Sequence, residues 1–263
     1  MGKFDGYLIC SDIDGTFTGG DRSEENMEAV RYFTENGGRF TFATGRLAGH
    51  LREKGLHALV NCPACLCNGS VIYDYKTDRI LREVHVSFSV EDFLDAIKPF
   101  SGTVAKLHIM PDGRSAMKDF LLSDPIPQEV LSSHPAKLLC RFNSAEKADA
   151  FKQSVLDDPL FSHTCIAKSW SLGVEFNDAA GSKGHGLDFL KKHLPGIHTT
   201  VGIGDYENDL SLLAHADIGV AVANAIEPLK QQADMIVASN KEAAIRDLIE
   251  KLESLPYAKN RIF

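Results

Sequence analysis

Two acidic turns, far apart in the chain, each follow a short run of apolar and β-branched residues. The first turn is residues 12–16 (DIDGT) and the second is residues 204–209 (GDYEND). Runs of this kind that end at Gly and Asp predict buried strands meeting loops. In an open parallel sheet, ligands bind where the strands end at their carboxyl edge. If both turns lie at that edge, up to four carboxylates converge there.

This convergence of like charges predicts a metal site. Carboxylates held close together tolerate one another only around a cation or with shifted pKa values. Oxygen ligands without a histidine cluster favour Mg²⁺ over zinc. The candidate ligands are Asp12, Asp14, Asp205 and Asp209.

Two further segments suit a phosphoryl group. Thr44 and Gly45 follow the strand-like run 40–43, and a hydroxyl with free backbone amides at a strand-to-helix turn can hold phosphoryl oxygens. Lys183 stands at the start of an amphipathic helix and offers a compact positive charge to the same oxygens. A metal, a hydroxyl, a lysine and a free carboxylate are the components that phosphoryl transfer requires.

The ordered motifs DxDGT, TGR, KG and GDxxND resemble those of the haloacid dehalogenase-like hydrolase superfamily, and most closely its Cof-type branch of phosphatases with a class IIB cap. The resemblance covers nearly the whole chain. The first and last motifs are specific, whereas TGR and KG gain weight from their order and spacing. The family implies an α/β fold, a Rossmann-like doubly wound parallel-sheet core with an inserted α+β cap domain.

The resemblance also implies roles for the acidic residues. Asp12 would be the nucleophile that forms an aspartyl-phosphate, and Asp14 would serve as acid and then base. Magnesium would bind Asp12, Asp205 and the main-chain carbonyl of Asp14. Asp209 would bind it through water or anchor Lys183.

The phosphate ligands implied by the family are Thr44, Gly45, Lys183 and Asn208. For Asn208 the alternative role is to orient Lys183. The role of Arg46 stays open between a salt bridge to core or cap and a contact to the substrate.

The pattern along the chain predicts two units. Residues 1–83 and 179–263 alternate strand and helix, which implies a parallel sheet with helices on both faces. Residues 84–178 mix strands and helices and predict an inserted α+β domain that closes over the site. Among the expected elements are helices at 47–59 and 240–253 and a strand at 84–86.

Composition is that of a globular enzyme, with 263 residues, 44% hydrophobic and 24% charged, and a net charge of −8. No basic block predicts nucleic-acid binding, no long apolar run predicts a membrane span, and the first residues lack the apolar core of a signal peptide. Six cysteines, including the C-x-x-C pair Cys62 and Cys65, are expected to be buried thiols in a reducing compartment. We expect a cytoplasmic monomer or small homo-oligomer.

Three functions fit these observations. The first is a Mg-dependent phosphatase that hydrolyses a small phosphorylated metabolite, such as a sugar phosphate. The second is a phosphomutase of the phosphomannomutase type, and the third is a non-catalytic metabolite-binding regulator. No motif in the cap region identifies the substrate, and the side chains there that could contact it are Lys106, His108, Lys137, Arg141 and Trp170.

Overall fold

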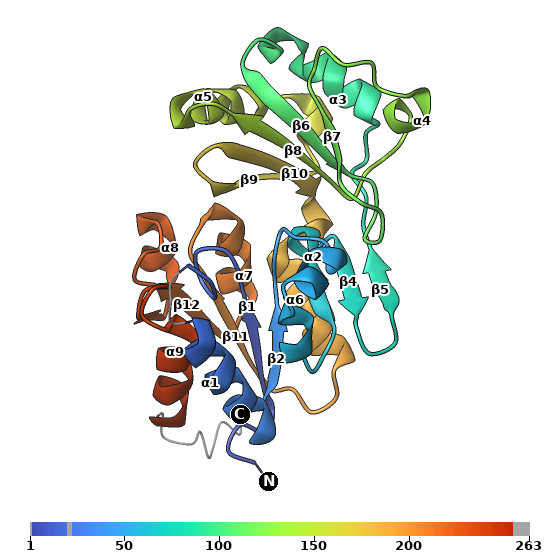
Figure 1. Cartoon of the computed structure of the whole chain (residues 1–263). Coiled ribbons are helices and arrows are strands. Elements are labelled where there is room, and N and C mark those ends of the chain that lie inside the picture. The colour runs from blue at the N-terminus through green and yellow to red at the C-terminus, as the bar shows by residue number, and fades with distance from the viewer. Residues whose placement is uncertain (1, 20–22, 255–263) are drawn as a thin grey trace.

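The computed structural model describes residues 2–19 and 23–254 and shows two units, one above the other (Figure 1). The lower unit, the core, is built on a five-stranded sheet whose neighbouring strands are all parallel. In spatial order its strands are β13 (Met235–Val237), β12 (Ile218–Val222), β11 (Thr199–Gly204), β1 (Tyr7–Ser11) and β2 (Arg39–Phe42).

Helices cover both faces of this sheet because its strands are apolar on both sides. Ile9 of β1 packs with Val30 and Leu248 on one face, whereas Leu8 packs with Leu187 on the other. The doubly wound α/β fold expected from the sequence is therefore confirmed. The core helices are α1 (Ser23–Glu35), α2 (Ala48–Glu53), α6 (Lys183–His193), α7 (Leu210–His215), α8 (Glu227–Gln232) and α9 (Ala244–Ser254).

An antiparallel three-stranded sheet lies beside β2 in the core. It consists of β3 (Ala64–Leu66), β4 (Val71–Asp74) and β5 (Arg79–Glu83). The sequence predicted alternating strand and helix in this region instead. Short 3₁₀ turns at Leu56–Leu59 and Cys67–Gly69 flank β3.

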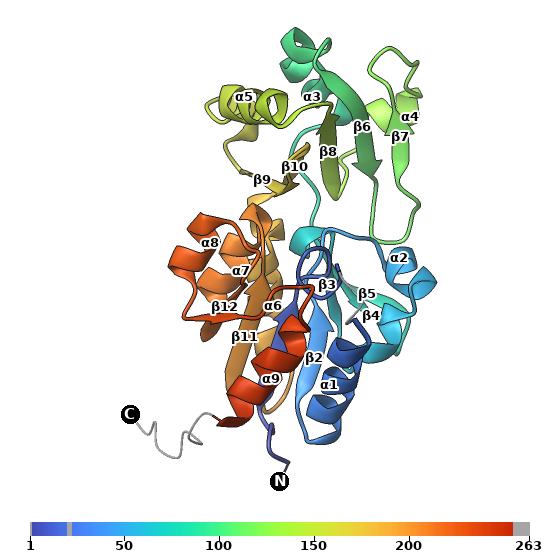
Figure 2. The ribbon, with the colours of Figure 1, turned by 60° about the vertical axis from the view of Figure 1, so that its left-hand side comes forward.

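The upper unit, the cap, has an antiparallel five-stranded sheet with its helices on one side (Figure 2). Its strands in spatial order are β7 (Lys118–Phe120), β6 (Val104–Met110), β8 (Lys137–Phe142), β10 (Gly173–Asp178) and β9 (Thr164–Trp170). Leu138, Phe151 and Phe176 belong to one apolar cluster between this sheet and the helices. The cap helices are α3 (Val90–Ile97), α4 (Gln128–Leu131) and α5 (Ala145–Val155).

Three predicted elements are wrong. Residues 84–86 form no strand, because the chain crosses there from core to cap and its amides bond to Ser70 and Pro135 carbonyls. The helix expected at 47–59 breaks at Gly55, which has a left-handed φ of 71°. The helix expected at 240–253 begins only at Ala244, after a positive φ at Ala243.

The two units meet at the carboxyl ends of the core strands, where the acidic turns lie (Figures 1 and 2). Across the boundary, Asn68 of the core donates to Glu175 of β10 at 2.8 Å, and Gly113 of the cap donates to Glu83 at 2.7 Å. Within the described residues, no helix is both long and apolar enough to span a membrane.

Candidate active site

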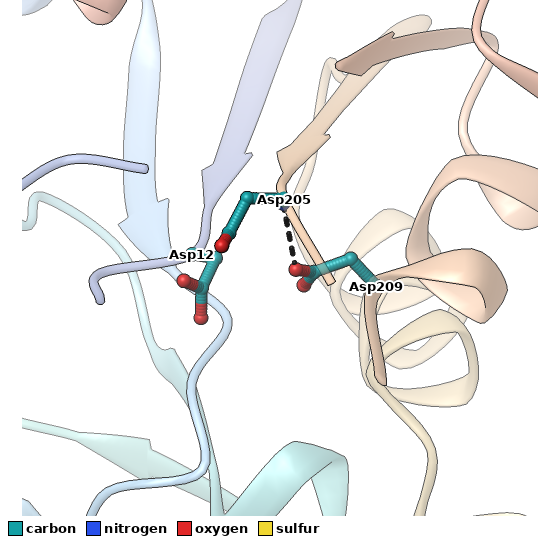
Figure 3. A group of neighbouring side chains, drawn as sticks. All are labelled: Asp12, Asp205 and Asp209. Carbon is teal, nitrogen blue, oxygen red and sulfur yellow. Dashed lines mark hydrogen bonds between the residues drawn. The ribbon is translucent and has the colours of Figure 1, made fainter. Parts of the chain in front are cut away.

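The two acidic turns lie side by side because β1 pairs with β11. Ser11 stands opposite Ile203, and the next amide, that of Asp12, donates to the Ile203 carbonyl at 2.9 Å. Asp12, Asp205 and Asp209 each offer a carboxylate oxygen, and these three oxygens lie within 4.8 Å of one another. Figure 3 shows the three side chains converging from the end of β1 and from the turn after β11.

Lys183 is the cation at this cluster. It is the first residue of α6, whose N-terminus is capped by the Ser182 hydroxyl, and its side chain is fully buried. Its Nζ donates to Asp12 Oδ1 at 2.7 Å and to Asp209 Oδ1 at 2.6 Å. Burial alone lowers the pKa of a lysine, but these two carboxylates raise the pKa of Lys183 by more, so it stays charged.

Asp209 uses both oxygens inside the protein. While Oδ1 accepts from Lys183, Oδ2 accepts from the amides of Asp205 and Tyr206 at 3.0 and 3.2 Å. The side chain therefore shapes the turn and fixes the lysine. Of the two roles considered for Asp209 from the sequence, this geometry favours the anchor.

Burial disfavours the charged forms of the Asp12 and Asp205 carboxylates. Desolvation is the main reason that the pKa of Asp12 is raised well above its usual value, and Lys183 only partly offsets it. Burial and the charge of Asp209 raise the pKa of Asp205 to about 7. A divalent cation among these oxygens would relieve both effects, and an all-oxygen donor set suits Mg²⁺. The residues present therefore fit the metal expected from the sequence.

Asp14 lies apart from this cluster. Its side chain is exposed, and Arg46 Nε and Nη2 donate to its two oxygens at 2.5 Å each. The open question about Arg46 is thus answered in this structure by a salt bridge to a core residue. The next residue, Gly15, has a φ of 87°, and a Cβ there would lie 2.3 Å from Asp205 Oδ2. Glycine lets the two turns approach this closely.

Thr44 and Gly45 line the same cavity as Asp12, Asp14 and Asp205. Thr44 is buried, its amide donates to Cys65 at 2.9 Å, and its hydroxyl oxygen accepts from the Arg46 amide at 3.3 Å. The Gly45 carbonyl accepts from Lys137 of the cap at 3.2 Å. Cap and core therefore meet directly at the candidate phosphate-binding turn.

Asn208 also lines the cavity, and its amide nitrogen donates to Asn68 Oδ1 at 3.2 Å. Among the hydrogen bonds of the described residues, none joins Asn208 to Lys183. The geometry thus favours a place at the cavity wall over the role of orienting the lysine.

The cavity has a volume of about 740 Å³ and lies between core and cap. Of the cap side chains named from the sequence, Lys137 and Trp170 line it, whereas Lys106 and His108 bond to Asp119. Glu175 was not predicted as a site residue, because its only signal in the sequence is one acidic residue in an apolar strand. His50 also lines the cavity, and its Nε2 is buried with no partner among the described residues.

Comparison with known proteins identifies the family. The family model for haloacid dehalogenase-like hydrolases matches residues 9–249. The chain belongs to this family. The family named from the sequence motifs is therefore confirmed.

Curated relatives align with this chain over nearly their whole length. The 5-amino-6-(5-phospho-D-ribitylamino)uracil phosphatase YwtE of Bacillus subtilis is 28% identical over 95% of this chain and 99% of its own. A phosphoglycolate phosphatase of Methanopyrus kandleri is 26% identical over 94% of this chain and 99% of its own. Among solved structures, a subclass IIB sugar phosphatase superposes with a TM-score of 0.75 at 20% identity, over 93% of this chain and 98% of that one. This last similarity shows that the two proteins share a fold.

Proposed function

We propose that this enzyme is a Mg-dependent phosphatase that hydrolyses small phosphorylated metabolites through an aspartyl-phosphate on Asp12. The observation that carries the proposal is the group of Asp12, Lys183, Asp205 and Asp209, in which Asp12 and Asp205 line the large cavity. The phosphatase names of the full-length relatives support it. Magnesium held by Asp12, Asp205 and the main-chain oxygen of Asp14 would supply positive charge to the phosphoryl oxygens.

The proposed reaction has two steps. A carboxylate oxygen of Asp12 attacks phosphorus, and the bond from phosphorus to the ester oxygen breaks. Asp14 protonates that leaving oxygen, then takes a proton from the water that attacks the aspartyl-phosphate and frees Asp12. Lys183 and Thr44 hold the equatorial oxygens as charge shifts onto them. To transfer these protons, Asp14 leaves its salt bridge with Arg46.

We also propose that residues 1–83 and 179–263 form the catalytic core and residues 84–178 the cap. The cap sheet roofs the cavity and so would exclude water and contact the leaving group.

The two alternatives have less support. A mutase needs positively charged side chains in the cap that bind a second phosphate group. In this cap, Lys137 already forms an ion pair with Glu175, and Arg114 donates to the Asp78 carbonyl. A purely regulatory protein would not need the whole buried group of acid, lysine and phosphate-binding side chains.

The test is phosphate release from a panel of small phosphomonoesters, with Mg²⁺ and after exhaustive chelation. Activity is expected only with Mg²⁺ or a close substitute. Asp12→Asn should abolish turnover because an amide cannot act as this nucleophile, whereas Asp188→Asn, an exposed change on α6, should leave it intact. Full activity after chelation, or normal turnover by Asp12→Asn, would overturn the proposal.

A further inference from the structure

The 3₁₀ turn Cys67–Gly69 packs against two of the segments that carry candidate phosphate ligands. Its Asn68 amide donates to the Thr44 carbonyl at 2.8 Å. Gly69 has a φ of 104°, and a Cβ there would lie 2.0 Å from the carbonyl oxygen of Ser182, the N-cap of α6. Only glycine permits so close an approach. The turn therefore supports both the loop after β2 and the start of α6.

The backbone of this turn is held in an uncommon conformation. Cys67 and Asn68 have positive φ values of 48° and 58°. Residues other than glycine rarely adopt this left-handed region, and asparagine does so more often than most. Such a backbone persists only where surrounding contacts fix it, and here the Cys67 amide donates to the Arg46 carbonyl at 3.1 Å. The place of Asn68 is thus set by the fold, independently of its side chain.

The side chain of Asn68 joins the core to the cap. It is buried, and its Oδ1 accepts from Asn208 Nδ2 at 3.2 Å. Its Nδ2 donates to Glu175 Oε2 at 2.8 Å and to Asn177 Oδ1 at 3.1 Å, both on the cap strand β10. A side-chain amide has two N–H donors, so both are used toward the cap while the oxygen is used in the core. One side chain therefore links the turn after β11 to the cap sheet.

Asn208 has one N–H left for a ligand. Among the described residues, its side chain donates one hydrogen bond, the bond to Asn68, and it lines the cavity together with Asp12 and Thr44. Its Nδ2 carries two hydrogens, so the second is available to a phosphoryl oxygen. The bond to Asn68 orients the amide and thereby the direction of this second N–H. Donors that are oriented in advance need no rearrangement when the ligand binds.

Asn68 itself stands behind the cavity wall. The described residues that line the cavity include Asn208 and Glu175 but not Asn68. We propose that Asn68 is a positioning residue for the proposed reaction: it directs the second N–H of Asn208 to the phosphoryl group and ties this alignment to Glu175 of the cap. The inference rests on the proposed function for the position of the phosphoryl group. The phosphate site is then fully aligned when the cap strand β10 lies on the core.

The first test removes the Asn68 side chain and keeps its backbone. Asn68→Gly retains the positive φ, because glycine adopts it freely. With Mg²⁺ present, calorimetry should show about tenfold weaker binding of inorganic phosphate, the effect of losing one hydrogen bond to a charged group. KM for a phosphomonoester should rise about as much, with kcat within a few-fold. The matched control is Ala243→Gly, a buried position with a φ of 61° before α9, which should leave both quantities unchanged.

The second test shows whether Asn68 acts through Asn208. Asn208→Ala should weaken phosphate binding by at least the same factor. In that background, adding Asn68→Gly should weaken it by less than about twofold, because the group that Asn68 orients is already gone. If the two losses are additive, or if Asn68→Gly binds phosphate as tightly as the parent chain, Asn68 does not position Asn208 and the inference is overturned.

The third test reverses the bond to the cap. Asn68→Asp keeps the acceptor for Asn208 but sets a second carboxylate against Glu175, so phosphate binding should weaken at least as much as in Asn68→Gly. Adding Glu175→Gln should recover most of that loss. The new amide can donate in the opposite direction, and the net charge beside Lys137 returns to that of the parent chain. No recovery would overturn the link to the cap, and this pair of variants also decides the matter if Asn68→Gly does not fold.

The binding measurements separate the role of Asn68 from the proposed function. A chain that binds phosphate in the expected pattern but releases none from any ester would refute the proposed function and support the role of Asn68. A Mg-dependent phosphatase whose phosphate affinity does not change with Asn68 would do the reverse. A parent chain that binds no phosphate would overturn both.

Discussion

Two buried lysines, one in the core and one in the cap, are each held by carboxylates but in different settings. Lys183 contacts two carboxylates, Asp12 and Asp209, that belong to the candidate catalytic turns. Lys137 contacts Glu175 of its own sheet and the Gly45 carbonyl across the boundary. Lys183 thus forms an ion pair with Asp12, the carboxylate proposed to attack phosphorus. Lys137 joins the cap to the turn that would hold phosphate.

The largest expected difference between the two lysines is in turnover. Lys183→Met should lower kcat by about 10²- to 10³-fold, because the charge that stabilises the phosphoryl oxygens is lost. Lys137→Met should raise KM and leave kcat within a few-fold, since the cap is proposed to contact the leaving group rather than the phosphoryl group. Steady-state kinetics with one phosphomonoester and Mg²⁺ measure both.

The control for folding is the thermal midpoint of each variant with Mg²⁺ present. Equal losses of kcat in the two variants would mean that the contrast between the lysines is wrong and that both act on the transition state.

The next prediction concerns the stability of the cap boundary. Glu175→Gln should cost about 1–3 kcal/mol of stability, because Lys137 is left buried without its counter-charge. The double variant Lys137→Met/Glu175→Gln should cost less than the sum of the two single changes, which a double-mutant cycle from urea unfolding will show.

The exposed pair Lys191 and Asp217 is the matched control, with side chains 38% and 40% exposed. Lys191→Met there should change stability by less than about 1 kcal/mol. If the losses in the free energy of unfolding at Lys137 and Glu175 were strictly additive, the two residues would not form a coupled unit.

Part of this comparison could be anticipated from the sequence. Lys183 begins a helix, and its motif comes in a fixed order with the two acidic turns, so the family resemblance implied its place beside them. Lys137 and Glu175 carry no such signal. They meet because β8 and β10 become neighbours in an antiparallel sheet, and that pairing depends on tertiary packing.

Local backbone geometry is equally hard to predict from the sequence. The helix break at Gly55 and the late start of α9 after Ala243 depend on left-handed φ values. The spacing of apolar residues along the sequence does not reveal such values. The salt bridge of Arg46 to Asp14 joins residues from two loops and was equally hidden. What the sequence does specify well is the buried strands and the turns directly after them.

A further prediction is that the metal site of the core is sensitive to pH. Since the pKa of Asp205 is raised to about 7, Mg²⁺ must displace a proton below that pH. Affinity for Mg²⁺ should rise up to about tenfold per pH unit below pH 7 and level off above it. Calorimetry in buffers of different ionisation enthalpy measures the affinity and the released proton.

The raised pKa of Asp205 has the opposite effect on the stability of the metal-free protein. Because the folded chain binds this proton more tightly than the unfolded chain, stability should fall as pH rises from about 4 to about 7. Asp205→Asn should weaken both effects. A magnesium affinity that does not vary with pH would show that Asp205 is not a ligand.

The smallest predicted effect separates Gly45 from Gly49, two glycines that line the same cavity. A Cβ at Gly45 would lie 2.9 Å from Lys137 Nζ, whereas a Cβ at Gly49 meets nothing within 4 Å. Gly45→Ala should push the flexible lysine end aside and raise KM by a few-fold, with kcat nearly unchanged. Gly49→Ala, inside helix α2, should leave KM unchanged and stabilise the fold by about 0.5–1 kcal/mol. Kinetics and urea unfolding of both variants test this, and an unchanged KM in Gly45→Ala would show that Lys137 does not need its contact with the phosphate-binding turn.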